Sequence, residues 1–219
     1  MNIGIIGGTG DEGRGLAVRW AMAGGRVILG SRTMERAADA ANSVNNLLGE
    51  QRVTPALNRD AVRGSNLVLL TVPFDHAAAT LESLREDFQE GAVLIDITVP
   101  VSFEKGRASY VEPPEGSASE HLQKLLPDGI SLVAAFKTEP AHLMLDPAAE
   151  LNCDTFVSSD SKEAREQVIR AIQSINGLRP VDAGPLFNCR VIERMTVLMI
   201  GLNRRYKVRS GRFKVLGLE

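Results

Sequence analysis

Residues 2–13, Asn2-Ile3-Gly4-Ile5-Ile6-Gly7-Gly8-Thr9-Gly10-Asp11-Glu12-Gly13, carry the clearest structural signal in this 219-residue chain. They predict an apolar strand at Ile3–Gly7 that runs into a G-x-G-x-x-G turn and a helix at Gly13–Ala23. A second apolar strand follows at Arg26–Leu29. In this context Gly8 permits a tight turn, Gly10 lets the backbone approach a pyrophosphate, and Gly13 lets helix and strand pack closely. The N-terminus of the helix attracts phosphate, so we predict a dinucleotide-binding unit.

The end of the second strand indicates which dinucleotide binds. An NAD site usually has Asp or Glu there, to hydrogen-bond the ribose hydroxyls. Here the sequence is Leu29-Gly30-Ser31-Arg32, with a hydroxyl and a guanidinium and no acid. A guanidinium can grip a dianionic 2′-phosphate in a charge-assisted fork, and Arg36, one helical turn later, can add a second cation. We therefore predict that the site binds NADP(H).

Apolar runs alternate with helical patterns along the rest of the chain, which is typical of a parallel sheet covered on both faces. The predicted fold is α/β, a Rossmann-type, doubly wound, mostly parallel sheet with a small C-terminal α/β lobe. The pattern changes near residues 145–155, so we predict a dinucleotide-binding domain at 1–150 and a small second domain at 151–219. Further strands are predicted at Val53–Leu57, Asn66–Val72, Ala92–Ile97, Ser131–Phe136 and Thr155–Ser158, with a short final strand at the end of the chain. Helices are predicted from the Thr33 N-cap to residue 48, from an Asp75 cap to about Phe88, and at 119–126, 162–176 and 188–206, with a short one after Pro140. Residues 101–118 and 180–185 are predicted to be irregular.

Two further segments follow strands at the edge where open α/β sheets bind ligands. One strand ends at Thr71, Val72 and Pro73. His76 follows at the start of the next helix, where it could contact a phosphate or a ribose, or could simply be an exposed residue of the helix. Val99 and Pro100 end the next strand and could shield one face of the nicotinamide, although an ordinary exit from the strand fits as well.

Composition excludes several classes of function. The formal net charge is −2, which does not predict a nucleic-acid or membrane-surface partner. We expect no signal peptide and no membrane span, and we expect a cytoplasmic location. Cys153 and Cys189 are interpreted as reduced thiols, with a single disulfide as the alternative. The three histidines form no ligand pattern with other residues, so no metal site is predicted.

The segment 190–214 is basic, with a formal charge of +7, which leaves −9 on the rest of the chain against the total of −2. It is either a solvated face, a site for an anionic ligand, or a surface that meets an acidic region of a second subunit. Apolar residues on the same predicted helix, from Met195 to Leu202, favour a subunit interface over a cofactor site. We therefore expect a homodimer formed through the 188–206 helix.

No residue pattern indicates a nucleophile, a catalytic acid or base, or a metal set. Hydride transfer tolerates this, because the cofactors carry the chemistry and the protein supplies alignment and excludes water.

Several of these motifs together resemble the NADPH-dependent reductases of coenzyme F420, an 8-hydroxy-5-deazaflavin. The resemblance covers nearly the whole chain and is carried by Gly7–Gly10, Gly13–Ala17, Gly30–Arg32, Thr71–Phe74 and the late segment Gly177–Leu186. It implies a Rossmann domain with a small C-terminal substrate-binding and dimerisation domain. It also implies that hydride passes directly between the nicotinamide C4 and the deazaflavin C5 in the cleft between them. The phosphodiester and glutamate tail of that coenzyme would explain the basic segment.

The resemblance also implies roles for individual residues. Thr9, Gly10, Asp11 and Glu12 would face the pyrophosphate, while Ser31, Arg32 and Arg36 would hold the 2′-phosphate. Lys137, Arg190, Arg194 and Thr196 are the predicted contacts to the deazaflavin. Three positions depart from the family pattern. Glu12 would repel a phosphate unless its carboxylate turns away, and Lys137 and Glu139 lie where a histidine and an apolar residue are expected, beside the second substrate.

Two other functions stay open at this point. The chain could reduce a flavin or a small imine or keto compound with NADPH. It could also be a non-catalytic NADP(H)-sensing module that acts through its dimer surface.

Overall fold

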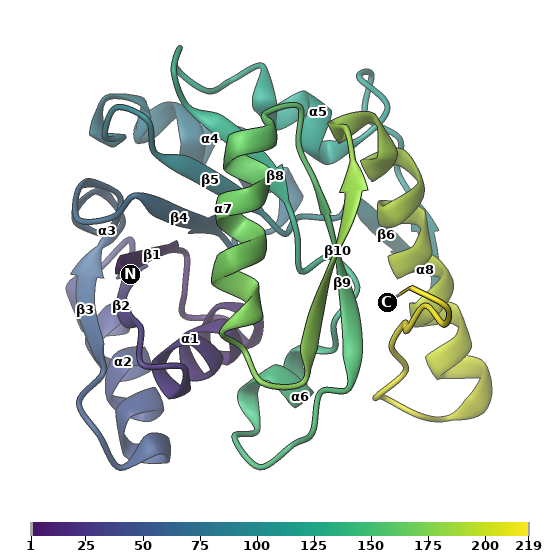
Figure 1. The fold of residues 1–219 in the computed structure, drawn as a ribbon, viewed down its shortest axis with the longest axis horizontal. Coiled ribbons are helices and arrows are strands. Elements are labelled where there is room, and N and C mark those ends of the chain that lie inside the picture. The colour runs from purple at the N-terminus through teal and green to yellow at the C-terminus, as the bar shows by residue number, and fades with distance from the viewer. Residues whose placement is uncertain (1, 219) are drawn as a thin grey trace.

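The computed structural model describes residues 2–218 and contains an eight-stranded sheet with helices on both faces (Figure 1). The strand order is β10-β9-β8-β5-β4-β1-β2-β3, and neighbouring strands are parallel except for the antiparallel pair β8 and β9. The order β3-β2-β1-β4-β5 is that of a Rossmann domain, so the predicted fold class is confirmed. The strands of this sheet are β1 (Asn2–Ile6), β2 (Arg26–Ser31), β3 (Val53–Leu57), β4 (Leu67–Leu70), β5 (Val93–Asp96), β8 (Ser131–Ala134), β9 (Cys153–Ser158) and β10 (Leu178–Gly184).

The helices divide between the two faces of the sheet, and each group closes its own apolar core. Residues alternate between the cores along each strand, so Ile5 packs in the first core and Ile6 in the second, which explains the continuous apolar runs. The first face carries α1 (Asp11–Met22), α2 (Met34–Leu48), α6 (Ala141–Leu145) and α7 (Lys162–Gln173). The second carries α3 (Asn58–Arg63), α4 (Phe74–Ser83), α5 (Ala118–Gln123) and the start of α8 (Cys189–Tyr206). Two short 3₁₀ helices, η1 (Arg85–Asp87) and η2 (Leu186–Asn188), complete the set.

Most predicted elements are present, and the differences have local causes. Thr33 caps α2 as predicted, because its hydroxyl accepts a hydrogen bond from the Arg36 amide. Asp75 does not cap α4, which begins one residue earlier, at Phe74, and has Pro73 at its N-cap. The short helix α3 between β3 and β4 was not predicted. It spans only six residues, too few for an apolar period to be read.

Three other predictions about regular structure are wrong. Residues 101–110 form a hairpin, β6 (Val101–Glu104) and β7 (Arg107–Tyr110), instead of an irregular segment. Its two loop residues, Lys105 and Gly106, both have positive φ, as a two-residue hairpin turn requires. The expected turn around Pro180 is the strand β10, which tolerates proline because it is an edge strand. The expected final strand is absent, since residues 207–218 contain no regular element.

The C-terminal part of the chain joins the same sheet, because β9 and β10 extend it beyond β8. Figure 1 shows α8 beyond these two strands at the side of the molecule, with the last residues folded back beside it. Among residues 2–218, no helix has the length and apolar character needed to cross a membrane.

Candidate functional site

The carboxyl ends of β1 and β4 meet where the connections from these neighbouring strands leave toward opposite ends of the sheet. Open α/β sheets bind ligands at such a switch point. A cavity of about 390 Å³ lies there, which we call the dinucleotide pocket. It is lined by most of the predicted cofactor contacts: Thr9, Gly10, Asp11, Glu12, Ser31, Arg32, Arg36, Thr71, Val72, Pro73 and His76.

The glycine turn after β1 has the geometry that its sequence predicts. A Cβ on Gly13 would lie 2.6 Å from the Gly8 Cα, so the third glycine is required for α1 to pack against the turn. Gly7, with φ of +71°, makes the turn itself possible. Gly10 is different, because a Cβ there meets nothing within 4 Å. That open space borders the pocket at the N-terminus of α1, where a pyrophosphate is expected.

The groups predicted to hold the 2′-phosphate lie together at the end of β2. Ser31 is buried at the strand end, while Arg32 and Arg36 are exposed and line the pocket. Across residues 2–218, no side-chain hydrogen bond or ion pair engages either guanidinium. Both cations are thus available to an anion in the pocket.

The structure adds residues that the sequence reasoning did not single out. Asn58 lines the pocket, and its carbonyl oxygen accepts a hydrogen bond from the Gly7 amide at 3.1 Å, which fixes the start of the glycine turn. Thr80 lines it from α4. Asn58 directly follows β3 and could have been found by the same strand-end rule. Val99 and Pro100 follow β5 as predicted but line neither this pocket nor the next one.

A second cavity of about 480 Å³, the second pocket, adjoins the first, because Asp11 and Glu12 line both. Its other walls come from the segment after β8 and from α8 with the residues that follow it. They consist of Lys137, Thr138, Glu139, Pro140, Ala141, His142, Thr196, Met199, Ile200, Asn203, Arg209 and Gly211. Residues more than 60 positions apart in sequence therefore form one wall.

Two carboxyl groups at this junction have perturbed proton affinities. Burial, together with the nearby charges of Glu139 and Asp11, raises the pKa of Glu12 to about 8. Burial also raises the pKa of Glu139 to about 7, although hydrogen bonds from Thr155 and Thr138 oppose it. At neutral pH Glu12 is mostly protonated. A protonated Glu12 carries no negative charge, so it does not repel a phosphate, whichever way its side chain turns.

Lys137 lines the second pocket and stays a predicted substrate contact, but its ammonium group is buried. Its side chain is fully buried, and Nζ lies 2.8 Å from Asp96 Oδ2 and 3.2 Å from Glu193 Oε1. Only other parts of the residue reach the second pocket. The ammonium group is thus engaged by two buried carboxylates in the ligand-free protein.

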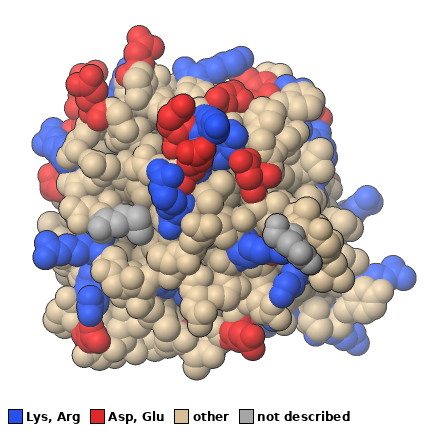
Figure 2. Space-filling view, viewed as in Figure 1, with Lys and Arg blue, Asp and Glu red and all other residues tan. Residues whose placement is uncertain are grey.

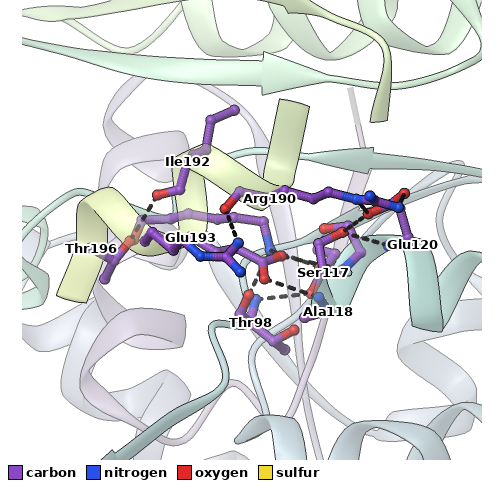
Figure 3. Close-up of polar contacts among 12 residues, drawn as sticks. Thr98, Ser117, Ala118, Glu120, Arg190, Ile192, Glu193 and Thr196 are labelled. Atoms are coloured by element: carbon purple, nitrogen blue, oxygen red, sulfur yellow. Dashed lines mark hydrogen bonds and ion pairs between the residues drawn. The ribbon is translucent and has the colours of Figure 1, made fainter. Parts of the chain in front are cut away.

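The other three predicted substrate contacts lie on α8, and only Thr196 lines the second pocket. Its hydroxyl donates to the Lys137 carbonyl at 2.7 Å. Arg190 and Arg194 point to the opposite side, where they pair with Glu120 at 2.8 Å and Glu112 at 2.7 Å (Figure 3 shows Arg190 and Glu120). Neither arginine lines the second pocket.

The basic segment is therefore partly neutralised by acids from other elements. Its remaining exposed cations include Arg204, Arg205, Lys207 and Arg209, at and after the end of α8. Figure 2 shows basic side chains at the lower right, where this end of α8 lies, with no acidic side chain among them. Of these residues, Arg209 lines the second pocket.

Two other sequence predictions concern cysteines and metals. Cys153 and Cys189 are both buried and unpaired, so the reading as free thiols is confirmed. No group of three or more His, Cys, Asp or Glu side chains within residues 2–218 is arranged to hold a metal ion.

Comparison with known proteins identifies similar chains. The sequence model of the family described as NADP oxidoreductase, coenzyme F420-dependent, matches residues 2–100. An F420-dependent NADP reductase of Methanothermobacter thermautotrophicus is 39% identical, with 100% of this chain and 96% of the relative aligned. One from Methanocaldococcus jannaschii is 33% identical, with 100% of both chains aligned. A solved structure from Arthrobacter sp. FB24, designated a candidate F420-dependent NADP reductase, superimposes with a TM-score of 0.82 at 26% identity, over 98% of this chain and 99% of that one.

Proposed function

The chain belongs to the coenzyme F420-dependent NADP oxidoreductases, and we propose that it transfers a hydride between NADP(H) and coenzyme F420. The single observation that carries this proposal is the contact between the two pockets. Asp11 and Glu12 line both of them, so the two pockets adjoin and can hold a nicotinamide and a deazaflavin next to each other. Direct hydride transfer needs this proximity and no protein nucleophile.

We propose that the dinucleotide pocket holds NADP(H) in one orientation. The Gly8–Gly13 turn receives the pyrophosphate, and Ser31, Arg32 and Arg36 receive the 2′-phosphate. The nicotinamide then points along Thr71–Pro73 toward the second pocket. Val99 and Pro100 stay proposed contacts, because only closure around a ligand could bring them to the ring.

The second pocket is the proposed site of the deazaflavin. Met199 and Ile200 supply apolar surface for a ring system, and Arg209 supplies a cation toward the anionic tail of the coenzyme. Thr196 stays a proposed substrate contact from α8. Arg190 and Arg194 also stay proposed contacts, but their guanidinium groups pair with Glu120 and Glu112 and would have to leave these partners to reach a ligand.

We propose that residues 1–150 supply the dinucleotide site and that residues 151–219 supply substrate contacts and a homodimer interface. Exposed apolar side chains on and next to α8 support the interface: Phe187, Val191 and Leu198 are all more than half exposed. A Leu198→Glu variant tests it, because a charge at a subunit contact shifts a dimer toward monomer in light scattering. Two buried, unpaired cysteines favour a reducing compartment, and we propose the cytoplasm.

An anaerobic absorbance assay tests the central proposal. Oxidised coenzyme F420 and NADPH are mixed with micromolar enzyme, and the visible band of the deazaflavin is followed. We expect it to bleach, and its persistence would overturn the proposal. Faster oxidation of NADPH by FMN, FAD or a cyclic imine than by F420 would favour the alternative acceptors. Tight NADPH binding without turnover of any of them would favour the sensing module.

A further inference from the structure

A buried ionic group lies directly behind the wall of the second pocket. Lys137 Nζ donates to Asp96 Oδ2 at 2.8 Å and to the Thr98 carbonyl at 2.5 Å, and it lies 3.2 Å from Glu193 Oε1. All three ionic side chains are fully shielded from solvent. We call Asp96, Lys137 and Glu193 the Lys137 cluster. Its three charged groups come from the end of β5, the segment after β8, and α8.

Glu193 connects α8 to two further elements. Its carboxylate accepts a hydrogen bond from the Tyr110 hydroxyl of β7 at 2.7 Å and from the Ala118 amide, at the start of α5, at 2.9 Å. Figure 3 shows Glu193 extending from α8 toward Ala118, while Arg190 of the same helix extends toward Glu120. The helix that contributes Thr196 to the second pocket is thus anchored to the body of the protein by a buried charge.

Asp96 connects the same group to the residues that follow β5. Its Oδ1 accepts a hydrogen bond from the Thr98 amide at 2.8 Å, and its Oδ2 accepts one from the Ser119 hydroxyl at 2.6 Å. The Thr98 carbonyl is held by Lys137 as well, so both backbone polar groups of Thr98 are fixed. The next two residues, Val99 and Pro100, are the ones that we propose reach the nicotinamide when the site closes around it.

The charge balance explains why the group is tightly held. Burial by itself lowers the pKa of Lys137, but the adjacent carboxylates of Asp96 and Glu193 more than offset this and raise it above its ordinary value. Lys137 is therefore charged: its ammonium donates hydrogen bonds to Asp96 and to the Thr98 carbonyl, and Glu193 is its second ion-pair partner. A buried ion pair is weak evidence for stability, because apolar side chains can often replace it without loss.

We propose that Asp96, Lys137 and Glu193 are positioning residues that hold α8 in register with residues 98–100, so that the two carriers keep a fixed separation. None of their charged groups touches either pocket, so they act through Thr98 and through Thr196, whose hydroxyl donates to the Lys137 carbonyl. This inference rests on the proposed function for its catalytic consequence. The coupling between α8 and residues 98–100 does not depend on that function and can be measured in the ligand-free protein.

Hydrogen exchange on the ligand-free protein tests the coupling. Glu193→Gln keeps the size of the side chain and weakens its hold on Lys137. Glu193 makes no hydrogen bond to residues 97–100, yet we expect their amides to exchange at least about threefold faster in this variant. Changes confined to residues 110–119, which include its direct partners, would overturn the proposal. Lys137→Met is the stronger variant, and Glu193→Gln keeps the test available if Lys137→Met does not fold.

Kinetics test the consequence for hydride transfer. We expect Glu193→Gln to lower kcat/KM for F420 about tenfold, while the Kd for NADPH, from fluorescence titration, stays within about twofold of wild type. A larger isotope effect with NADPH deuterated at the transferred position would accompany this loss. A purely structural residue would lower Tm without changing the isotope effect or the kinetic constants per folded molecule, and that result would overturn the proposal.

The matched control is Arg63→Met. It removes the partner of Asp87, another buried carboxylate, at a 2.5 Å ion pair near the amino end of β4, at the edge of the sheet opposite the pockets. We expect it to lower Tm and to leave the kinetic constants of folded enzyme unchanged. If wild-type protein does not reduce F420, the proposed function fails, while the exchange experiment still decides whether the cluster couples α8 to residues 98–100.

Discussion

The dinucleotide pocket and the Lys137 cluster use polar groups in opposite ways. At the pocket, Arg32 and Arg36 are exposed, with no side-chain partner across residues 2–218, and Gly10 borders open space. In the cluster, the ammonium of Lys137 pairs with two carboxylates and one backbone carbonyl and has no access to solvent. The pocket lies open to a ligand, whereas the cluster is closed by the protein itself. A binding group can thus be distinguished from a positioning group by its partners: the first is left free for a ligand, and the second is already paired with other groups of the protein.

The largest expected effect separates two glycines within the open region. Gly13→Ala places a methyl group 2.6 Å from the Gly8 Cα, which neither backbone can relieve by a rotamer change. We expect a loss of about 3 kcal/mol or more in the free energy of unfolding, measured by urea denaturation, because α1 must move off the turn. NADPH binding should be lost with it.

Gly10→Ala is the matched variant, because its methyl group meets no protein atom within 4 Å. We expect its urea midpoint to stay near that of wild type, while NADPH binding weakens about tenfold or more by steric conflict with the pyrophosphate. Equal stability losses in the two variants would contradict this division between a packing glycine and a binding glycine.

The next effect tests whether the unpaired cations serve a ligand. Arg32→Ala removes a guanidinium that is exposed and without a partner, so the fold should keep its Tm. A charge-assisted contact to a 2′-phosphate is worth about 2–3 kcal/mol, so we expect NADPH to bind roughly 30- to 150-fold more weakly. The Kd for NADH should change little. An equal loss for both dinucleotides, measured by fluorescence titration, would show that Arg32 does not contact the 2′-phosphate.

The same contrast explains how much of the structure could be predicted from sequence. The β1–α1–β2 unit is local: its glycines, its strand and the two residues Ser31 and Arg32 lie within about 30 positions, and each type of residue has one physical task there. The fold class followed from the alternation of apolar runs and helices. The hairpin β6–β7 and the edge strand β10 were missed, because Gly106 and Pro180 normally indicate irregular turns.

The second pocket and the Lys137 cluster were beyond the reach of sequence motifs. Asp96, Lys137 and Glu193 are separated by about 40 to 60 positions, and only the sheet order and the placement of α8 bring them together. One signal was available. Lys137 directly follows the apolar run Leu132–Phe136, and a lysine at the end of a buried strand needs a carboxylate partner. That argument could have predicted a buried ion pair, but it could not have identified Glu193.

A third prediction concerns Glu139, a buried carboxyl group whose ionised form destabilises the folded protein. Its pKa is raised from 4.5 to about 7, so the folded protein binds its proton more tightly than the unfolded chain does. The stability that this proton supports is complete below about pH 4.5 and is lost as pH rises through 7. At about pH 8 the cost is at most about 3 kcal/mol, and we expect Glu139→Gln to recover about 1–2 kcal/mol.

Urea denaturation at about pH 5 and pH 8 measures this effect, and the gain should be confined to the higher pH. The control is Glu163→Gln, which changes an exposed carboxylate in the first turn of α7. A gain of equal size at both pH values would mean that packing, and not the proton, limits stability at Glu139.

The smallest effect lies at Glu12, which lines both the dinucleotide pocket and the second pocket. Its pKa of about 8 means that it carries a proton at neutral pH and ionises above pH 8, next to the expected pyrophosphate. If NADPH binds only the protonated form, its Kd should rise about tenfold between pH 7 and pH 9, because binding then requires proton uptake. Glu12→Gln should bind NADPH with the same affinity across that range.

Asp75→Asn is the control, since Asp75 is an exposed acid beside His76 and should leave the pH dependence intact. Titrations at several pH values above 7.5 avoid ionisation of histidine and of the 2′-phosphate. A flat profile in wild-type protein would show that the charge of Glu12 does not act on the bound phosphates. A steep profile that disappears in Glu12→Gln and persists in Asp75→Asn would show that the dinucleotide binds with the Glu12 carboxyl protonated.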